Sequence, residues 1–267
     1  MSNQLVFLKL GGSLITVKDR PHTPRLEVLE HLADEIAEAR SADLDMQILL
    51  GHGSGSYGHV PAHQYHTREG VKTVDEWSGF VEVWRQAAAL NHLVMDAIAY
   101  AGIPALAFPP SASVTAQQGK VTTWDLDPLR TALQNGLVPV VYGDVVFDQA
   151  LGGTILSTEE LFAHLRRELH PSRLLFAGLE PGVWRDYPAN AVLWSEITPA
   201  NFPQVEAGLK GSAATDVTGG MLDKVRHVLS MVSDDPSVQA SIFSGEAPGN
   251  VRRSLLGEEL GTMVRRA

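Results

Sequence analysis

A dense run of glycines that ends in a histidine is the part of this sequence best suited to chemistry. It spans Gly51 to His59, in the order Gly-His-Gly-Ser-Gly-Ser-Tyr-Gly-His, and follows the apolar run Met46 to Leu50, which is typical of a short buried strand. Such closely spaced glycines let the backbone turn sharply and direct several N–H groups at one anion, most often phosphate. We therefore predict that this loop holds a phosphorylated small molecule and that His59 contacts the reacting group.

A second glycine pair follows the first strand-like run of the chain. Leu5 to Leu10 is apolar apart from Lys9, and Gly11-Gly12-Ser13 comes directly after it. A lysine just before a Gly-Gly turn is well placed to bind phosphate, although an edge-strand lysine could instead reach out to water. Lys18 lies further on in a polar loop, where a lysine considered alone would be a solvated charge.

The run Gly51 to His59 has a rival interpretation as a dinucleotide-binding turn. Residues Gly53 to Gly58 satisfy the spacing Gly-x-Gly-x-x-Gly. That fingerprint belongs after the first strand of a βαβ unit and opens a helix directly. Here the run follows the second strand, and Pro61 with a histidine-rich polar segment follows it instead of an apolar helix. The order of elements therefore disfavours a dinucleotide.

Two further interpretations of the same stretch are a metal site and a turn that merely packs tightly. A metal site would use the histidines that cluster here, which are His52, His59, His63 and His66. No aspartate or glutamate lies among them, and Pro61 is expected to interrupt the helix that would align them. A purely structural turn stays open, but two glycine-rich strand ends with nearby lysines favour phosphate.

Strand-like runs alternate with helical patterns along the chain. The strands are predicted at Leu5–Leu10, Met46–Leu50, Ile103–Phe108, Leu137–Tyr142, Arg173–Gly178 and Val238–Phe243, and the main helices at Leu26–Ala39, Trp77–Gly102, Leu126–Asn135, Ser157–Leu169 and Met221–Val232. We predict an α/β fold, a three-layer αβα sandwich with a mostly parallel central sheet. Ligands of such folds lie at the carboxyl ends of the strands, where the glycine clusters fall. The acidic residues of the first helix, Glu35 among them, read as a solvated face.

Composition narrows the classes of protein that remain. The chain has 267 residues, a net charge of −10 and no cysteine. Nucleic acid and anionic membranes are unfavourable partners for such a charge, and the absence of cysteine excludes disulfides, thiolate catalysis and cysteine-bound metal. No apolar run approaches the roughly 20 residues that span a bilayer, and the N-terminus lacks the pattern of a signal peptide. We expect a cytoplasmic protein.

Four motifs together resemble the amino acid kinase superfamily and, within it, the isopentenyl phosphate kinase family. They are Lys9-Leu-Gly-Gly-Ser13 with Lys18, the His52-to-His59 loop, Gly143-Asp144, and Asp216-Val-Thr-Gly-Gly-Met-Leu-Asp-Lys224. Their order and spacing match over nearly the whole chain. The histidine that ends the loop is the more specific mark, because acetylglutamate and aspartate kinases lack it whereas fosfomycin kinases share it.

This resemblance implies transfer of the γ-phosphoryl group of ATP, with Mg²⁺, to isopentenyl phosphate or a related phosphate monoester. It implies that Lys9, Lys18 and Lys224 spread over the moving group, that Asp144 orients the lysines, and that Gly11, Gly12, Gly53 and Gly55 offer backbone N–H groups. The implied catalytic residues are Lys9, Lys18, His59, Asp144 and Lys224; the acceptor-binding residues are Gly53, Ser54, Gly55, His59 and Gly143; the nucleotide-binding residues are Lys9, Gly11, Gly12, Ser13, Asp216, Thr218, Gly219, Gly220 and Lys224.

The resemblance also implies an organisation. Residues 1–267 would form one amino acid kinase domain, with an acceptor lobe over 1–175 and a nucleotide lobe over 176–267. The apolar tail of the acceptor would lie against the helix that carries Phe80 to Ile98. No protein ligand to a metal is implied, and the family analogy suggests a homodimer.

The sequence departs from the family pattern at several positions. Ser54 replaces the middle glycine of the loop, and Tyr57 replaces a phenylalanine. Thr158 and Glu159 replace a Gly-Asp pair, and the segment Ala177 to Glu180 lacks an aspartate; both changes fall where the family contacts or organises nucleotide. Two alternatives therefore accompany the main prediction: a fosfomycin-type or other small phosphate or phosphonate kinase, and a non-catalytic homologue that binds a phosphate ligand.

Overall fold

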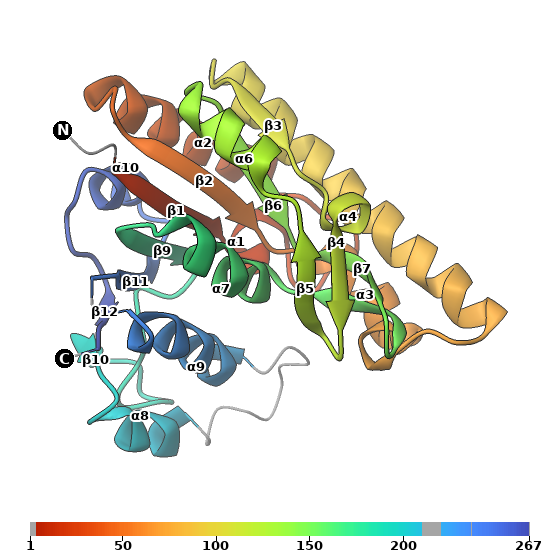
Figure 1. Ribbon diagram of the computed structural model, residues 1–267. Coiled ribbons are helices and arrows are strands. Elements are labelled where there is room, and N and C mark those ends of the chain that lie inside the picture. Colours follow the sequence, from red (N-terminus) through yellow and green to blue (C-terminus); the bar gives the residue numbers. More distant parts are fainter. Residues whose placement is uncertain (1–3, 210–219, 236, 267) are drawn as a thin grey trace.

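A single eight-stranded sheet runs through the computed structural model, which describes residues 4–209, 220–235 and 237–266 and, at 59–61, the backbone alone (Figure 1). Its order in space is β10 (Glu196–Ile197), β12 (Thr262–Val264), β11 (Gln239–Ser244), β9 (Arg173–Gly178), β1 (Leu5–Leu10), β2 (Gln47–His52), β6 (Val138–Tyr142) and β3 (Ala105–Ala107). Among the described strands of this sheet, only β11 and β12 pair antiparallel. The predicted mostly parallel sheet is confirmed.

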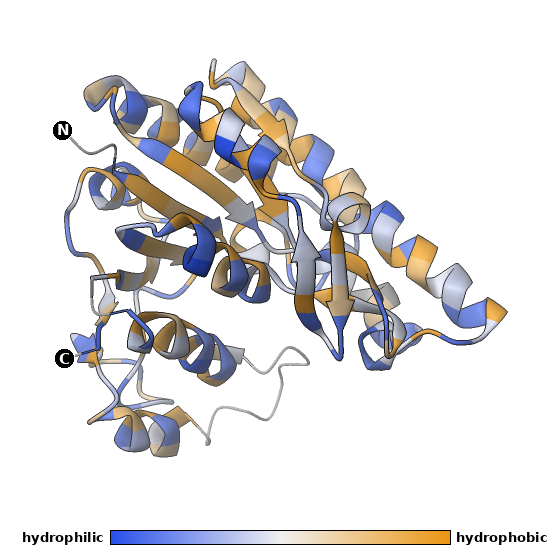
Figure 2. Cartoon of the chain, in the orientation of Figure 1, coloured by the Kyte–Doolittle hydropathy of each residue, from blue (hydrophilic) through white to orange (hydrophobic). Residues whose placement is uncertain are grey.

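Helices cover both faces of this sheet, as predicted for a three-layer sandwich. One face packs against α1 (Gly12–Ile15), α2 (Leu26–Ala42), α4 (Val74–Tyr100) and α10 (Asn250–Leu255). The other packs against α6 (Asp127–Gln134), α7 (Thr158–Leu169), α8 (Phe202–Leu209) and α9 (Gly220–Ser233). Figure 2 shows the central strands as continuous hydrophobic ribbons, which is expected of strands that are buried on both sides.

Side chains of each central strand alternate between these two faces, and this alternation positions the site. On β1, Phe7 joins the core under α6 to α9, whereas Leu8 and Leu10 join the core under α2, α4 and α10. On β2, Leu49 and Leu50 divide in the same way. The period of two therefore places Lys9 on the α7 and α9 face and His52 on the α4 face.

A second sheet of four strands lies beside the first. Its order is β5 (Lys120–Trp124), β4 (Val114–Gln117), β7 (Asp144–Asp148) and β8 (Gly152–Leu156). This sheet is made of two hairpins, β4–β5 and β7–β8. Asp148 fastens the two hairpins together, because its carboxylate accepts the N–H groups of Gln118, Gly119, Ala150 and Leu151 at 2.8–3.0 Å.

The glycine loop after β2 opens directly into a helix, α3 (Gly55–Gln64), which is followed by the short 3₁₀ turn η1 (Thr67–Glu69). The expectation that Pro61 would prevent a helix here is wrong. The proline lacks an N–H and so removes one hydrogen bond, but α3 packs along α4, and tertiary packing outweighs the local preference. The remaining short helix, α5 (Pro110–Ser113), precedes β4.

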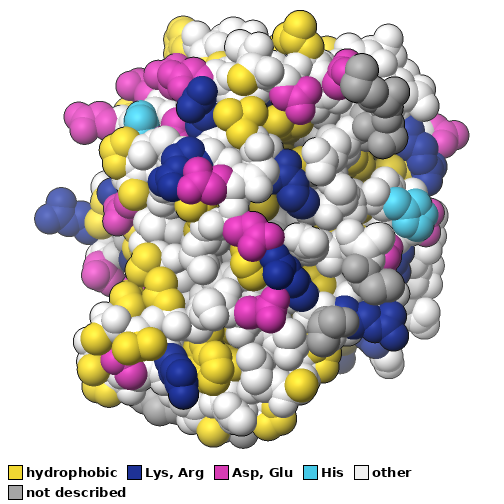
Figure 3. Space-filling view, turned by 90° about the vertical axis from the view of Figure 1, so that its left-hand side faces the viewer, with side chains coloured by type: hydrophobic (Ala, Val, Ile, Leu, Met, Phe, Trp, Pro, Cys, Tyr) yellow, Lys and Arg dark blue, Asp and Glu magenta, His cyan; other side chains and the backbone are white. Residues whose placement is uncertain are grey.

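Glu35 is not part of a solvated face, contrary to the prediction for the first helix. Its side chain is buried, and its two oxygens accept the N–H groups of Gly249 at 2.7 Å and Arg252 at 3.0 Å, at the start of α10. The carboxylate therefore caps the neighbouring helix. Elsewhere on the surface, Figure 3 shows acidic and basic side chains interspersed on the face it presents.

Candidate active site

The first glycine loop (Gly11–Ser13) follows β1, and the second glycine loop (Gly53–Gly58) follows β2. The two loops meet at the carboxyl edge of the sheet, because the strands that precede them end in register. Leu10 lies opposite His52 on one side and Ala177 on the other. A Cβ atom added to Gly53 would lie only 2.9 Å from the Gly12 nitrogen, and one added to Gly12 would collide with the backbone of Gly55. Glycine is required at this contact because the two loops pack backbone against backbone.

The amide hydrogens of the first residue in each loop are already used within the sheet. Gly11 N–H donates to the Ala177 carbonyl at 2.8 Å, and Gly53 N–H donates to the Leu10 carbonyl at 3.0 Å. The expectation that Gly11 and Gly53 offer N–H groups to an anion is therefore wrong. The next N–H groups, of Gly12, Ser13, Ser54 and Gly55, make no hydrogen bond to another described residue.

Thr16 holds the two loops together. Its buried hydroxyl donates to the Gly12 carbonyl at 2.8 Å and accepts the N–H of Ser56 at 2.9 Å. One side chain thus bridges the first turn of α1 and the first turn of α3. The separation of the two sets of N–H groups is fixed as a consequence, which is the preorganisation that electrostatic stabilisation needs.

Lys9 forms a buried ion pair with Glu159, the second residue of α7. Burial disfavours the ionised carboxylate, but the Lys9 ammonium and the more distant Lys224 outweigh it, so the pKa of Glu159 is lowered. Lys224 lies on α9, and its Nζ is 3.7 Å from the position of a Cβ added to Gly178. Two of the predicted lysines therefore converge on one carboxylate at the sheet edge.

The sequence at the start of α7 explains the position of Glu159. Ser157 caps the helix by accepting the N–H of Glu160 at 3.2 Å, and the Glu160 carboxylate accepts the N–H of Ser157 at 2.7 Å, so the two residues form a capping box. The Thr158 hydroxyl donates to the His52 carbonyl at 2.6 Å and ties this turn to β2. Thr158 and Glu159, two of the departures from the family pattern, thus both make buried contacts.

Asp144, the first residue of β7, is fully buried. Its carboxylate accepts the N–H of Val145 at 2.8 Å and of Ser111 at 3.2 Å. Burial raises the pKa of Asp144 to about 6, because desolvation exceeds the effect of these hydrogen bonds. The carboxylate that contacts Lys9 is Glu159 and not Asp144, which differs from the orienting role implied for Asp144.

The other predicted residues lie around this edge or outside the described part of the chain. Gly143 donates its N–H to the His52 carbonyl at 3.2 Å, and Lys18 is exposed in the loop after α1. Gly220 begins α9 with a positive φ of 59°. His59 belongs to α3, but its side chain is outside the described atoms, and Asp216, Thr218 and Gly219 are outside the described residues.

A small apolar cluster lies between α4 and the β7–β8 hairpin, apart from the two main cores. It consists of Val71, Phe80, Val83 and Val145, with Ala62, Trp77 and Ile155 packed against it. A Cβ added to Gly153 would lie 2.7 Å from the Phe80 ring, so the hairpin approaches α4 closely. Ala62 is on α3, one turn after His59, and the cluster therefore adjoins the helix that the second glycine loop opens.

Sequence reasoning marked Glu159 only as a departure from the family pattern, and it missed Thr16 and Asn91 as residues of this region. Asn91 lies on α4, and its side-chain oxygen is 3.2 Å from His52 Nε2. Lys9 and Glu159 are 150 residues apart, so no local pattern could pair them. For Thr16 a signal existed, since a hydroxyl residue four positions after Gly12 can bond back to that carbonyl.

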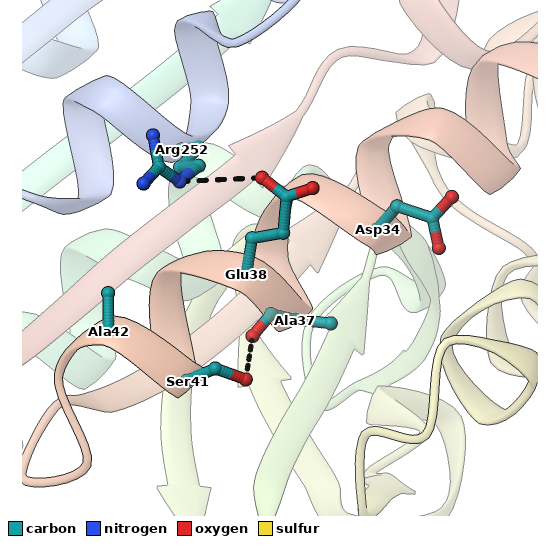
Figure 4. A pocket seen from close by; sticks show the side chains of 6 residues that line it. All are labelled: Asp34, Ala37, Glu38, Ser41, Ala42 and Arg252. Atoms are coloured by element: carbon teal, nitrogen blue, oxygen red, sulfur yellow. Dashed lines mark hydrogen bonds and ion pairs between the residues drawn. The ribbon is translucent and has the colours of Figure 1, made fainter.

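A surface hollow lies elsewhere, between α2 and α10 (Figure 4). It measures about 600 Å³ and is lined by Asp34, Ala37, Glu38, Ser41, Ala42 and Arg252. Arg252 and Glu38 approach to 3.4 Å across it, and the arrangement is that of a surface groove with none of the predicted site residues. Over the described ranges, no three acidic, histidine or cysteine side chains group as metal ligands, and no helix is long and apolar enough to cross a membrane.

Comparison with known proteins places the chain in one family. Residues 4–243 match the amino acid kinase family. The isopentenyl phosphate kinase of Methanothermobacter thermautotrophicus is 35% identical, over 97% of this chain and 98% of the relative, and that of Haloferax volcanii is 32% identical over 93% and 98%. A solved structure of isopentenyl phosphate kinase superposes with a TM-score of 0.82 at 31% identity, covering 97% of this chain and 99% of that one.

Proposed function

The chain belongs to the amino acid kinase family, and we propose that it is an isopentenyl phosphate kinase, which transfers a phosphoryl group from ATP to isopentenyl phosphate. The observation that carries this proposal is the junction of the two glycine loops, backbone against backbone, beside Lys9 at the carboxyl edge of the sheet. Two sets of N–H groups there can bind two phosphates at a fixed separation. That is the arrangement needed to pass a phosphoryl group from one phosphate to another.

The reaction is an in-line displacement at the γ-phosphorus of ATP. A phosphate oxygen of the acceptor forms the new P–O bond, the bond between the γ-phosphorus and the β,γ-bridging oxygen breaks, and its electron pair leaves with ADP. The product is isopentenyl diphosphate. Positioning and charge stabilisation are the main requirements, because no covalent help from the protein is needed.

We assign the charge stabilisation to Lys9, Lys18 and Lys224. Glu159 holds Lys9 in place while the ammonium keeps further N–H donors for phosphate oxygens, since an ammonium has three. The cations neutralise the charge that spreads over the equatorial oxygens in the transition state. Gly12 and Ser13, on the first loop, add backbone N–H groups on the nucleotide side.

The acceptor phosphate is assigned to the second loop, with Ser54 and Gly55 as its backbone donors and His59 as its side-chain donor. An alkyl phosphate has a second pKa of about 6 and is largely dianionic near neutral pH. No strong general base is then required. His59 would orient the acceptor and offset its charge.

The apolar tail of the acceptor is assigned to the cluster of Phe80, Val83 and Val145. This cluster adjoins α3, so a molecule whose phosphate lies at the second loop can extend its hydrocarbon chain between α4 and the β7–β8 hairpin. A branched five-carbon chain buries enough apolar surface there to add measurable affinity. A polar acceptor would gain nothing from these side chains.

ATP and Mg²⁺ complete the proposal. We assign the acceptor to residues 1–175 and the nucleotide to residues 176–267. Both segments contribute strands to the eight-stranded sheet, and the boundary between them falls within β9. Mg²⁺ would enter with the nucleotide, because this cation prefers phosphate and water oxygens to a cage of protein ligands. Its contribution is to offset the charge of the leaving diphosphate.

We also propose that the protein is a homodimer. The support is a row of exposed apolar side chains on α4, namely Val74, Val81 and Trp84. Their spacing of seven and three residues puts them on one side of the helix. Light scattering of the purified chain should give twice the monomer mass, and a monomer mass would remove this part of the proposal.

A substrate panel with ADP formation as the readout tests the proposed function. The acceptors are isopentenyl phosphate, a straight-chain alkyl phosphate, fosfomycin and UMP. We expect the highest kcat/KM for isopentenyl phosphate, because it alone combines a phosphate with a branched apolar tail of matching size. Turnover of fosfomycin without any alkyl phosphate would make the protein an antibiotic kinase. Binding of phosphate esters without ATP binding or turnover would make it a ligand-binding homologue.

A further inference from the structure

His52, the last residue of β2, is fully buried and has no part in the mechanism above. Its ring lies flat against the Tyr142 ring, with centroids 5.2 Å apart and planes 11° apart. Nδ1 is 3.1 Å from the Gly53 carbonyl oxygen, and Nε2 is 3.2 Å from the side-chain oxygen of Asn91. The imidazole therefore links α4 to the backbone of the second glycine loop.

Only one protonation pattern of the ring satisfies both contacts without a buried charge. Burial lowers the pKa of His52, so the imidazole is neutral and carries a single N–H. If Nδ1 carries it, this group donates to the Gly53 carbonyl. Nε2 is then an acceptor, and the Asn91 amide, turned by half a rotation, donates its N–H to Nε2.

The hydrogen bond on the Gly53 carbonyl fixes the peptide group that joins Gly53 to Ser54. In a planar trans peptide the C=O and the following N–H point in opposite directions. A carbonyl held toward His52 therefore leaves the Ser54 N–H pointing away from the interior. That N–H makes no hydrogen bond to another described residue. A peptide next to glycine can rotate easily, so an unpinned Gly53 carbonyl could turn and withdraw this donor.

We propose that His52 is a positioning residue for the acceptor phosphate: its imidazole pins the Gly53 carbonyl so that the Ser54 N–H faces the phosphate. Asn91 holds the ring in the tautomer that can do this, and Tyr142 holds its plane. This inference rests on the proposed function, because it takes the second loop as the acceptor site. The histidine is needed here for its hydrogen bond and not for its charge.

Two substitutions at the same position separate the hydrogen bond from the packing. His52→Phe keeps a flat ring against Tyr142 and removes the donor. His52→Asn places an amide N–H near the position of Nδ1 and so restores the donor in a smaller side chain. The matched control is His164→Phe, because His164 also stacks on an aromatic ring, that of Trp124, but lies on α7 away from the loop.

The measurements are binding of isopentenyl phosphate and of inorganic phosphate by calorimetry, together with kcat and both KM values. For His52→Phe we expect binding of both ligands, and KM for isopentenyl phosphate, to weaken about tenfold, as the loss of one ordered donor to a charged group predicts. The KM for ATP should change less than about twofold, as for the control. His52→Asn should recover most of the binding.

Equal losses in His52→Phe and His52→Asn would overturn the inference, as would a lower thermal midpoint with unchanged phosphate binding. If His52→Phe does not fold, Asn91→Leu provides the test, because it frees the ring to change tautomer while leaving the imidazole in place. We expect weaker phosphate binding in that variant, and unchanged binding would contradict the proposal. Because calorimetry needs no turnover, a wild-type protein that binds isopentenyl phosphate but never consumes ATP would refute the proposed function and still allow this test.

Discussion

Two buried polar pairs lie on neighbouring strands and opposite faces of the sheet. Lys9 on β1 pairs with Glu159 on the face that α7 and α9 cover, whereas His52 on β2 pairs with Asn91 on the face that α4 covers. The first pair is ionic, and the lowered pKa of Glu159 keeps it so; the lowered pKa of His52 keeps the second pair neutral. Lys9 lies just before the first glycine loop, and His52 lies just before the second.

In the proposed function, this difference lets one sheet edge bind two phosphates with different requirements. The transferred phosphoryl group gains charge-sensitive stabilisation in the transition state, so a cation must be present and held still. The acceptor phosphate needs a fixed direction, which neutral donors provide without a second buried charge. The buried ion pair is also more sensitive to substitution than the neutral pair, because removal of one partner leaves the other charge uncompensated.

The largest effect should follow from breaking the ionic pair. Lys9→Met should lower kcat about a thousandfold, equivalent to about 4 kcal/mol of transition-state stabilisation, because the variant keeps the shape of the side chain and loses its charge. It should also destabilise the fold, because Glu159 is left buried without its partner. ADP formation and urea unfolding measure the two effects.

The double variant Lys9→Met with Glu159→Met sharpens this test. It should recover the free energy of unfolding but not kcat, since the unpaired carboxylate is gone while the cation is still missing. Lys120→Met, at an exposed lysine on β5, is the control and should change neither quantity. A double variant with normal turnover would show that Lys9 is only structural.

The next largest effect should be a pH-dependent stability that belongs to Asp144. Its folded pKa of about 6 lies above the ordinary 3.8, so its contribution to stability is full below about pH 4 and is lost as the pH rises through 6. The change amounts to about 3 kcal/mol over that window. We therefore expect the free energy of unfolding, measured with urea, to fall as pH rises in the wild type relative to Asp144→Asn. A difference in the free energy of unfolding that does not depend on pH would contradict the raised pKa of the buried Asp144 carboxyl group.

Replacing the predicted acceptor-contacting histidine should have a somewhat smaller effect. His59→Ala should lower kcat/KM for isopentenyl phosphate about a hundredfold, or about 2.7 kcal/mol, through loss of a donor to a dianion. His63→Ala, one turn further along α3 at an exposed position, is the matched control. Undiminished activity in His59→Ala would remove His59 from the site.

The smallest of these effects should come from separating the two loops. Gly53→Ala places a Cβ 2.9 Å from the Gly12 nitrogen, so the loops must shift by a few tenths of an ångström. We expect kcat/KM to fall about tenfold, because misplaced N–H groups stabilise the transferred group less well. Gly208→Ala on α8, where the nearest atom would be 3.7 Å away, should leave activity unchanged. An active Gly53→Ala variant would show that close contact of the loops is not required.

Much of the architecture could be predicted because it follows from local patterns. The strand Arg173–Gly178 was predicted with its observed bounds, and the capping box at Ser157 and Glu160 formed as its spacing indicated. The β4–β5 hairpin was missed, although Gln118 and Gly119, both with positive φ, separate two alternating runs in the manner of a two-residue turn.

The parts that could not be predicted depend on contacts between distant segments. The sequence marks Glu159 only as a departure from the family pattern, and its contact with Lys9 depends on the fold. Glu35 reads as a surface residue until the fold places the start of α10 against it. The helix through Pro61 forms because α4 supports it. In each case packing reversed what the local sequence favours.

The most direct test of the account is to identify the product formed from isopentenyl phosphate and ATP by the wild-type chain, using phosphorus NMR. We expect the monoester signal to be replaced by the two coupled signals of a diphosphate monoester, with one ADP formed for each acceptor consumed. ADP formation without any new diphosphate ester, or no loss of the monoester at all, would contradict the claim that the two glycine loops join two phosphates.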